Sequence, residues 1–179
     1  QGKRRVLIKF PVYPTYMRTL AAWWPEARIV HITRDPRSIA ASKTNDPSGT
    51  GKLIKQYPIL KSVLPKLGMA FAVFQYELAS RAHCAMRGRS GYRVFMYEDL
   101  VNGPEEEIRS LCDFIDLDFR CEMLEPAPGQ KSSITGQHTD GFDRSRVGGW
   151  QQIISPMWAK AITWCVRPAM RRYGFSPGE

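Results

Sequence analysis

The sequence predicts an α/β fold in three layers, with a largely parallel sheet flanked by helices. Three short apolar runs have the composition of buried strands: residues 5–10, 27–32 and 92–97. A helical pattern follows each of them, and parallel strands need such crossover connections. A chain of 179 residues is expected to form one domain. These observations together favour a single domain built on a parallel sheet.

The first β-α-β unit occupies the amino-terminal part of the chain. Residues 5–10 predict a strand, and Pro11 and Pro14 stop it. Apolar residues then recur at helical spacing over residues 15–24, before Pro25 ends the pattern. Because crossovers between strands of one sheet are right-handed and join parallel strands, residues 5–10 and 27–32 are expected to lie parallel.

A turn with an unusual charge pattern follows the second strand. Pro36 suits the first helical position, since its missing N–H would be unpaired there anyway, and apolar residues carry the helix to Ser42. Ligands of open α/β sheets bind just outside the carboxyl ends of strands, and a helix N-terminus favours an anion. Arg34 and Arg37 add positive charge at this position. The sequence therefore predicts an anion site here.

The middle of the chain predicts an irregular segment and then a long helix. Residues 44–65 have loop composition, and they predict either a lid or acceptor-binding segment or a plain surface excursion. Residues 67–86 return to helical spacing, with a stripe that is expected to pack in the core. The stripe consists of Phe71, Phe74, Leu78 and Ala82.

The third strand begins at Tyr92 and ends in an acidic turn, where Glu98 and Asp99 are interpreted as structural residues. Pro104 and three glutamates then open a helix whose expected inner face is formed by Ile108, Leu111, Cys112 and Ile115. Residues 126–143 predict an active-site loop, and residues 156–173 predict the last helix.

Composition limits the classes of partner. The chain is 43% hydrophobic and 24% charged, as in globular proteins, and its net charge of +9 suits nucleic acid, an anionic membrane or a multiply phosphorylated nucleotide. The four cysteines show no metal-ligand spacing, and Cys84, Cys112 and Cys165 are expected to be packed thiols. With no membrane-length apolar stretch and no signal peptide, a cytoplasmic location is favoured.

The turn after the second strand carries a family resemblance. Arg34-Asp35-Pro36-Arg37, with Ser42 eight residues after Arg34, resembles the 3′-phosphate-binding segment of sulfotransferases that use 3′-phosphoadenosine 5′-phosphosulfate (PAPS). The resemblance implies that Arg34 and Ser42 hold the 3′-phosphate. Lys9-Phe10-Pro11 is similar to a second landmark, in which the lysine contacts the phosphosulfate and stabilises charge on the bridging oxygen.

Two later segments extend the resemblance. The Tyr97-Glu98-Asp99-Leu100 ending is similar to a landmark whose tyrosine lies near the adenine, which assigns Tyr97 to the base. The segment 144–150 resembles the family's basic, glycine-containing nucleotide loop and implies cofactor binding by Arg144, Arg146 and Gly148. Loops in the position of 126–143 carry a serine that touches the sulfuryl group or phosphates, and Ser133, or else Ser132, is the candidate.

The resemblance implies a P-loop NTPase-like sulfotransferase fold and a reaction that needs no metal. A sulfuryl group would pass from PAPS to a hydroxyl or amine of a small molecule, glycan or protein, leaving adenosine 3′,5′-bisphosphate. Pro11 stands where some relatives have a catalytic histidine, and His138 is only a secondary candidate for acid–base work.

The sequence also departs from the family at its beginning. No glycine-rich phosphosulfate loop precedes Lys9, so residues 1–179 are expected to be the carboxyl-terminal portion of a longer, N-terminally truncated domain. Because the loop that aligns the sulfuryl group with its acceptor is missing, this fragment alone is expected to be inactive.

Two alternatives remain open at this stage. A P-loop nucleotide kinase would carry a Walker A lysine and a Mg²⁺-binding Asp or Ser, and the sequence shows neither. A non-catalytic, nucleic-acid-binding α/β domain would interleave arginines with aromatic residues along one face. The basic residues here instead gather after predicted strand ends, which favours the sulfotransferase interpretation.

Overall fold

In the part of the chain that the structure describes, the sheet consists of two parallel strands. The computed structural model describes residues 5–9, 14–44, 50–125, 142, 144 and 147–176. Within them, β1 (Ile29–Thr33) pairs with β2 (Tyr92–Met96), from Ile29 opposite Tyr92 to Thr33 opposite Met96. This parallel pair, with helices on both faces, confirms the predicted α/β class.

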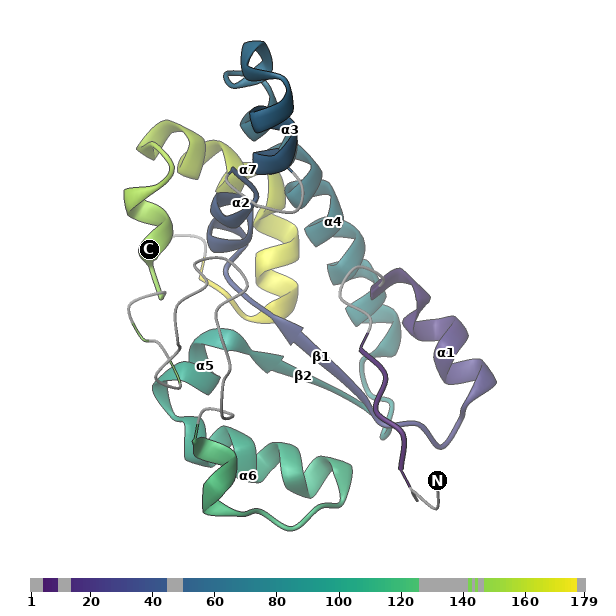
Figure 1. Ribbon diagram of the computed structural model, residues 1–179. Helices are drawn as coiled ribbons and strands as arrows, with labels where there is room; N and C mark the ends of the chain where they lie inside the picture. Colours follow the sequence, from purple (N-terminus) through teal and green to yellow (C-terminus); the bar gives the residue numbers. More distant parts are fainter. Residues whose placement is uncertain are drawn as a thin grey trace.

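Helices cover both faces of the sheet (Figure 1). The helix α4 lies on one face beside α7, with α1 and α2 at its two ends, while α5 and α6 lie on the other face. The α-helices are α1 (Met17–Trp23), α2 (Pro36–Thr44), α3 (Thr50–Gln56), α4 (Leu64–Met86), α5 (Tyr97–Asn102), α6 (Pro104–Ile115) and α7 (Pro156–Tyr173). The 3₁₀ turns are η1 (Pro14–Tyr16), η2 (Pro58–Leu60), η3 (Cys121–Leu124) and η5 (Gly149–Gln152).

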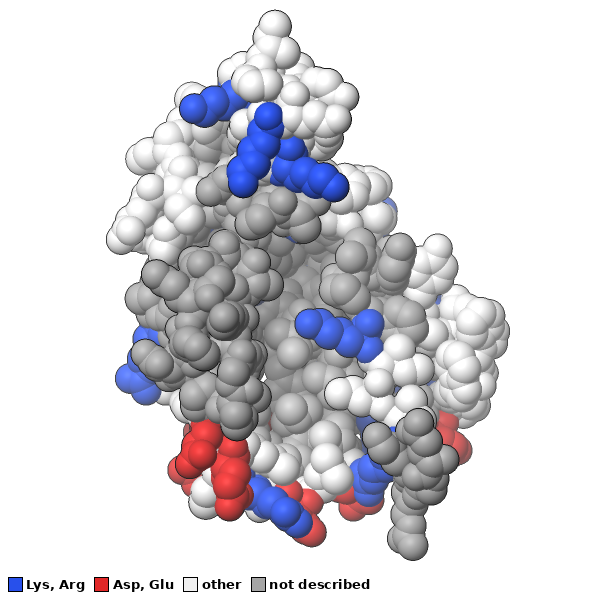
Figure 2. Space-filling view, in the orientation of Figure 1, with Lys and Arg blue, Asp and Glu red and all other residues white. Residues whose placement is uncertain are grey.

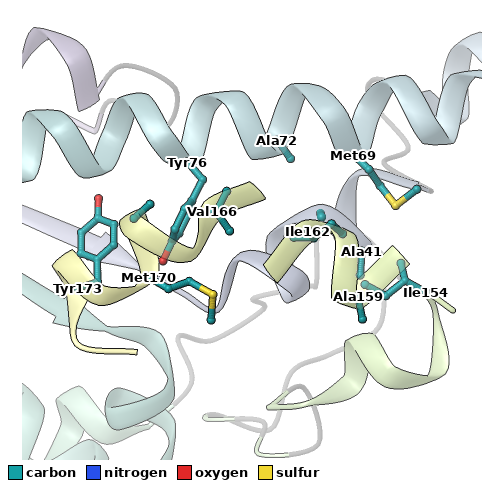
Figure 3. Packing of buried hydrophobic residues seen from close by; sticks show 12 residues of the cluster. Ala41, Met69, Ala72, Tyr76, Ile154, Ala159, Ile162, Val166, Met170 and Tyr173 are labelled. Atoms are coloured by element: carbon teal, nitrogen blue, oxygen red, sulfur yellow. The ribbon is translucent and has the colours of Figure 1, made fainter. Parts of the chain in front are cut away.

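The main core fills the space between α2, α4 and α7 (Figure 3). Small residues of α2 allow close packing, and Ala40 and Ala41 are 0% and 3% exposed. The long helix α4 contributes Met69, Ala72 and Tyr76, and α7 contributes a stripe at helical spacing. That stripe contains Ala159, Ile162, Val166, Ala169, Met170 and Tyr173. The predicted helices at 67–86 and 156–173 are thus confirmed.

The face of α4 that packs is not the one predicted. The expected core stripe leaves Phe71 57% exposed and Phe74 58% exposed, with Leu78 and Ala82 only half-buried. The buried face instead runs through Met69, Tyr76 and His83. Both faces of this helix carry large apolar or aromatic residues, so periodicity alone could not decide which one meets α7.

A polar cluster lies where the amino ends of the strands meet α4. The Tyr92 hydroxyl is 2.8 Å from Nδ1 of both His31 and His83, so it donates to one ring and accepts from the other. Burial, and then the neighbouring His83, lower the pKa of His31 to about 4. The cluster joins β1, β2 and α4 through two neutral histidines.

The predicted strand at 5–10 is wrong for the residues described. Residues 5–9 have no regular secondary structure, and Val6 and Leu7 are 83% and 97% exposed. Arg5 holds the segment to the end of α6, donating to the Ile115 carbonyl at 2.6 Å and to Asp116 at 3.2 Å. A strand needs a neighbouring strand for its backbone groups, and β1 pairs only with β2 in the described part of the sheet.

Four smaller expectations also need correction. Residues 50–56 form α3 rather than a loop, because good helix formers outweigh Gly51. Residues from Tyr97 onward form α5 instead of continuing the strand. Ile32 is 59% exposed, so β1 is not buried on both faces. Of the three cysteines expected to be packed, Cys112 is buried, whereas Cys84 and Cys165 are exposed.

Among the described helices, none is long and apolar enough to span a bilayer.

Candidate functional site

The turn between β1 and α2 is held by its own aspartate. The Asp35 carboxylate accepts hydrogen bonds from the Arg37 backbone N–H at 2.7 Å and from the Arg37 guanidinium at 2.7 to 3.1 Å. Both side chains are nearly buried, at 13% and 11% exposure. A two-pronged arginine–carboxylate pair fixes geometry as well as charge. Arg37 is therefore neutralised within the turn and does not add the free positive charge expected from the sequence.

Arg34 is the cation that the turn presents. It follows β1 directly, where the parallel register brings it beside Tyr97, the first residue after β2. Its guanidinium carbon lies 4.5 Å from the centroid of the Tyr97 ring, in a cation–π contact. Its Nε lies 4.0 Å from Oε1 of Glu98, and the side chain is 25% exposed. Arg34 is thus positioned by two residues of the neighbouring chain segment.

Glu98 is a site residue that the sequence did not reveal. Its Oε1 accepts the backbone N–H of Asp35 at 3.0 Å, which ties the start of α5 to the turn after β1. Burial is the main influence on this carboxyl and raises its pKa, while the Asp35 N–H and Arg34 act in the opposite direction. Its Oε2 is buried with no hydrogen-bond partner among the described residues. Glu98 therefore has the expected structural role, and its contacts also place it beside Arg34.

The glycine-containing segment near the carboxyl end also reaches this turn. The Arg37 guanidinium carbon lies 4.4 Å from the centroid of the Trp150 ring, and Trp150 packs against the main core. Gly148 has a φ of 77°, a left-handed conformation that favours glycine. The fold therefore brings Arg37 of the turn against Trp150, and nucleotide binding by Gly148 stays a prediction.

Arg144 is held elsewhere. Its guanidinium donates to the backbone carbonyls of Val101 at 3.4 Å and Asn102 at 3.1 Å, at the end of α5. These bonds satisfy carbonyls that lack a partner within the helix. In this conformation Arg144 stabilises α5, and its expected contact with a phosphate stays a prediction.

The two α2 serines differ in their surroundings. Ser42 is exposed, and its hydroxyl donates to the Ile39 carbonyl of its own helix at 2.7 Å. Ser38 lies one turn closer to Arg34 and is 5% exposed, and its Oγ has no hydrogen-bond partner among the residues described. Ser38 was not among the predicted site residues, although its place in the first turn of α2 was a usable signal.

The remaining predicted residues are either exposed or outside the part of the chain that the structure describes. Lys9 is exposed at the end of the irregular segment 5–9. Ser132, Ser133, His138 and Arg146 lie outside the described residues.

Comparisons with known proteins now identify the family. The sequence profile described as "Sulfotransferase family" matches residues 1–120, which is more than half of the chain. The chain belongs to the sulfotransferase family. The matched range contains the Arg34 turn, Tyr97 and Glu98, whereas residues 144–150 lie beyond it.

One relative and two solved protein domains are similar to different shares of the chain. The nodulation protein NoeE of Sinorhizobium fredii is 30% identical over 119 residues, which are 60% of this chain and 27% of that protein. A solved sulfotransferase domain of the curacin biosynthetic pathway aligns with a TM-score of 0.65 at 18% identity, covering 92% of this chain and 59% of that domain. The sulfotransferase domain of the Synechococcus PCC 7002 olefin synthase aligns at 0.60 and 20% identity, over 84% of this chain and half of that domain. The two solved domains establish the sulfotransferase fold.

The residues of this sulfotransferase turn suit a phosphate. Arg34 offers a planar fork of N–H donors at the amino end of α2, where the Arg37 N–H is already taken by Asp35. Ser38 supplies a buried hydroxyl whose hydrogen-bonding capacity is unused among the described residues. These donors are of the type that binds the oxygens of a phosphate ester.

A basic cavity lies near the start of β2, at the end of the strand opposite to the Arg34 turn. Its volume is about 380 Å³, and its lining includes Arg87, Arg93, Arg171 and Arg172. Arg172 is paired with Glu77 at 2.8 Å, and the cavity adjoins the C-terminal ends of α4 and α7. Helix C-termini repel anions, and ligands of parallel sheets bind at the carboxyl ends of strands. The Arg34 turn is therefore the candidate site.

Proposed function

We propose that the chain forms the 3′-phosphate-binding part of a PAPS-dependent sulfotransferase. The reaction transfers a sulfuryl group from PAPS to an acceptor hydroxyl or amine and releases adenosine 3′,5′-bisphosphate. The observation that carries this proposal is Arg34, which lies at the carboxyl end of β1, against the Tyr97 ring and beside Glu98. Family membership supplies the reaction class, and the turn supplies the reason for a 3′-phosphate.

The charges of the turn support binding of an anion. Asp35 cancels Arg37, so Arg34 and the N-terminal dipole of α2 provide the attraction. A phosphate at the turn gains charge-assisted hydrogen bonds from the Arg34 guanidinium, and Ser38 and Ser42 are neutral donors on the same helix.

In this mechanism the turn contributes binding and orientation. PAPS carries the reactive sulfur at its 5′ end, so a residue that holds the 3′-phosphate acts at a distance from the bond that breaks. Fixing the nucleotide aligns the sulfuryl group with the acceptor oxygen or nitrogen, which attacks sulfur as the bond to the bridging oxygen breaks. Lys9 is proposed to stabilise charge on that oxygen, and Ser133 to touch the transferring group. Tyr97, whose ring packs against Arg34, is proposed to reach the adenine with its hydroxyl edge.

Calorimetric titration of the 179-residue chain tests this function. Adenosine 3′,5′-bisphosphate should bind without Mg²⁺ and at least about tenfold more tightly than ATP, because only the bisphosphate offers a 3′-phosphate to Arg34. A Mg²⁺-dependent preference for ATP would favour the kinase alternative, and preferential binding of a mixed oligonucleotide would favour the nucleic-acid-binding alternative. Either result would overturn the proposal.

A further inference from the structure

A second surface of the chain combines lysines with exposed apolar side chains. The sequence from residue 50 to residue 76 contains four lysines and no Asp or Glu. It forms α3, η2 and the first half of α4, a projecting end of the molecule in Figure 1. The "α3–α4 face" consists of Leu53, Tyr57, Ile59, Leu60, Val63, Leu67, Phe71 and Phe74, together with Lys52, Lys55, Lys61 and Lys66.

The apolar members of this face are accessible to solvent. Ile59 is 89% exposed, and Leu67, Phe71 and Phe74 are each between 57% and 58% exposed. Their spacing of three and four residues places Val63, Leu67, Phe71 and Phe74 in one stripe along α4, continuous with the end formed by η2. Contiguous apolar surface of this kind marks an interaction site, whereas single exposed apolar residues need no explanation.

The charge of the face identifies the kind of partner. All four lysines are exposed. Figure 2 shows basic side chains around α3, while the Asp and Glu side chains visible on that side lie toward the opposite end of the molecule. A partner must therefore present negative charge over an apolar layer. Self-association through this face would bring two sets of lysines together, and their repulsion disfavours a second copy.

We propose that the α3–α4 face binds the surface of an anionic lipid bilayer. Basic residues beside exposed Ile, Leu, Phe and Tyr side chains are the features with which interfacial helices enter the boundary between headgroups and acyl chains. The lysines contact the headgroups, and Ile59, Leu60 and Phe71 enter the apolar boundary. The proposal is independent of the proposed enzymatic function, because the face does not include the Arg34 turn.

Vesicle co-flotation of the 179-residue chain tests the proposal. The chain should float with vesicles of phosphatidylcholine and phosphatidylglycerol in a 7:3 ratio, bind pure phosphatidylcholine weakly, and dissociate as KCl is raised from about 0.1 to 0.5 M. The double variant Lys52→Ser/Lys55→Ser should lower the partition coefficient about tenfold or more. Ile59→Ser/Leu60→Ser should lower it by a similar factor, because the apolar anchor is lost.

Matched controls distinguish this face from general positive charge. Arg87→Ser/Arg171→Ser removes two exposed cations at the other end of the molecule, and Trp164→Ser removes an apolar side chain that is 79% exposed on α7. Both controls should change the partition coefficient by less than about twofold. Circular dichroism verifies that every variant is folded.

Four outcomes overturn the proposal. The native chain could fail to float with the anionic vesicles, or bind neutral vesicles equally well. The controls could lower binding as much as the α3–α4 variants, which would indicate general charge attraction. Light scattering could reveal a dimer that Ile59→Ser/Leu60→Ser dissociates, which would assign the face to a second copy.

Discussion

The Arg34 turn and the Lys9 segment make an instructive pair. The sequence predicts the same arrangement for both, a cation at the carboxyl end of a buried strand. In the structure, Arg34 follows a paired strand, packs against Tyr97 and lies near Glu98. Lys9 instead ends a segment without regular structure in which Leu7 is 97% exposed.

The difference shows what positions a functional cation. Apolar β-branched residues make both segments suitable for a strand, but only β1 has a partner strand whose end supplies neighbours for the cation. The turn after β1 is further fixed by Asp35 and by the contact of Arg37 with Trp150. A charged residue becomes part of a site when other elements hold it, and the predictions below test this for each residue.

Breaking the Asp35–Arg37 pair within the turn should have the largest effect, and it should act on the stability of the fold. Asp35→Ala leaves the Arg37 guanidinium without its nearly buried carboxylate and removes the acceptor of the Arg37 N–H, which should lower the free energy of unfolding by about 2–4 kcal/mol. Urea denaturation measures this change. Glu105→Ala, which breaks an exposed pair with Arg109, is the control and should cost less than about 1 kcal/mol. If Asp35→Ala and Glu105→Ala lowered the free energy of unfolding equally, the Asp35–Arg37 pair would not be what holds the turn.

Removing the Arg34 side chain should weaken nucleotide binding more than it destabilises the fold. Arg34→Ala should weaken adenosine 3′,5′-bisphosphate by about 1.5–3 kcal/mol, or roughly ten- to a hundredfold, because a charge-assisted hydrogen bond is lost. Adenosine 5′-phosphate should bind as before. Arg28→Ala, at the other end of β1, provides the arginine control for this calorimetric measurement. A similar loss for both nucleotides would show that Arg34 does not recognise the 3′-phosphate.

Neutralising Glu98, the neighbour of Arg34, should strengthen nucleotide binding, by a smaller factor than Arg34→Ala weakens it. Glu98→Gln keeps an oxygen for the Asp35 N–H and removes a negative charge, so adenosine 3′,5′-bisphosphate should bind about threefold more tightly near pH 8. The pKa of Glu98 is raised, and the carboxyl carries less charge as the pH falls. The advantage of the variant should therefore shrink as the pH is lowered from about 8. Titrations across this range would contradict the assignment if the ratio of the two affinities stayed constant.

The smallest effect is expected at Lys9. Because Lys9 is exposed, Lys9→Met in the 179-residue chain should change the free energy of unfolding by less than about 0.5 kcal/mol and leave adenosine 3′,5′-bisphosphate affinity unchanged. Urea denaturation and calorimetry measure both quantities. In a complete enzyme, the same substitution should reduce turnover much more than nucleotide affinity, because the charge acts on the transition state. A large loss of stability would show that Lys9 is held in place after all.

The sequence was sufficient for the elements whose signals are local. Pro36 and Pro104 mark the starts of α2 and α6, and the apolar spacing of residues 156–173 predicts α7 with its observed bounds. Local sequence signals do not determine which face of α4 is buried. It depends on which side meets α2 and α7, and Phe71 and Met69 are equally apolar candidates for the core.

The site was predictable to the extent that it follows strand ends. Arg34 and Tyr97 were found because each comes at the end of an apolar run, and the parallel register then places them side by side. Glu98 was missed because it was interpreted only as a structural residue of the turn after the strand, and its contact with the Asp35 N–H depends on how α5 begins. Arg37 was misjudged because its charge is visible in the sequence, whereas its pairing with Asp35 is a matter of turn geometry.

The register of the two strands has a consequence for how the chain folds. Asp35 and Glu98 are 63 positions apart, and the pairs of β1 and β2 share this separation. Their contact closes a large loop that contains α2, α3 and α4, and such closure is slow relative to local helix formation. The cation–π and carboxylate contacts around Arg34 therefore depend on this closure, whereas the helices within the loop do not. A nucleotide that binds this turn should slow global unfolding while leaving the early formation of α4 unchanged.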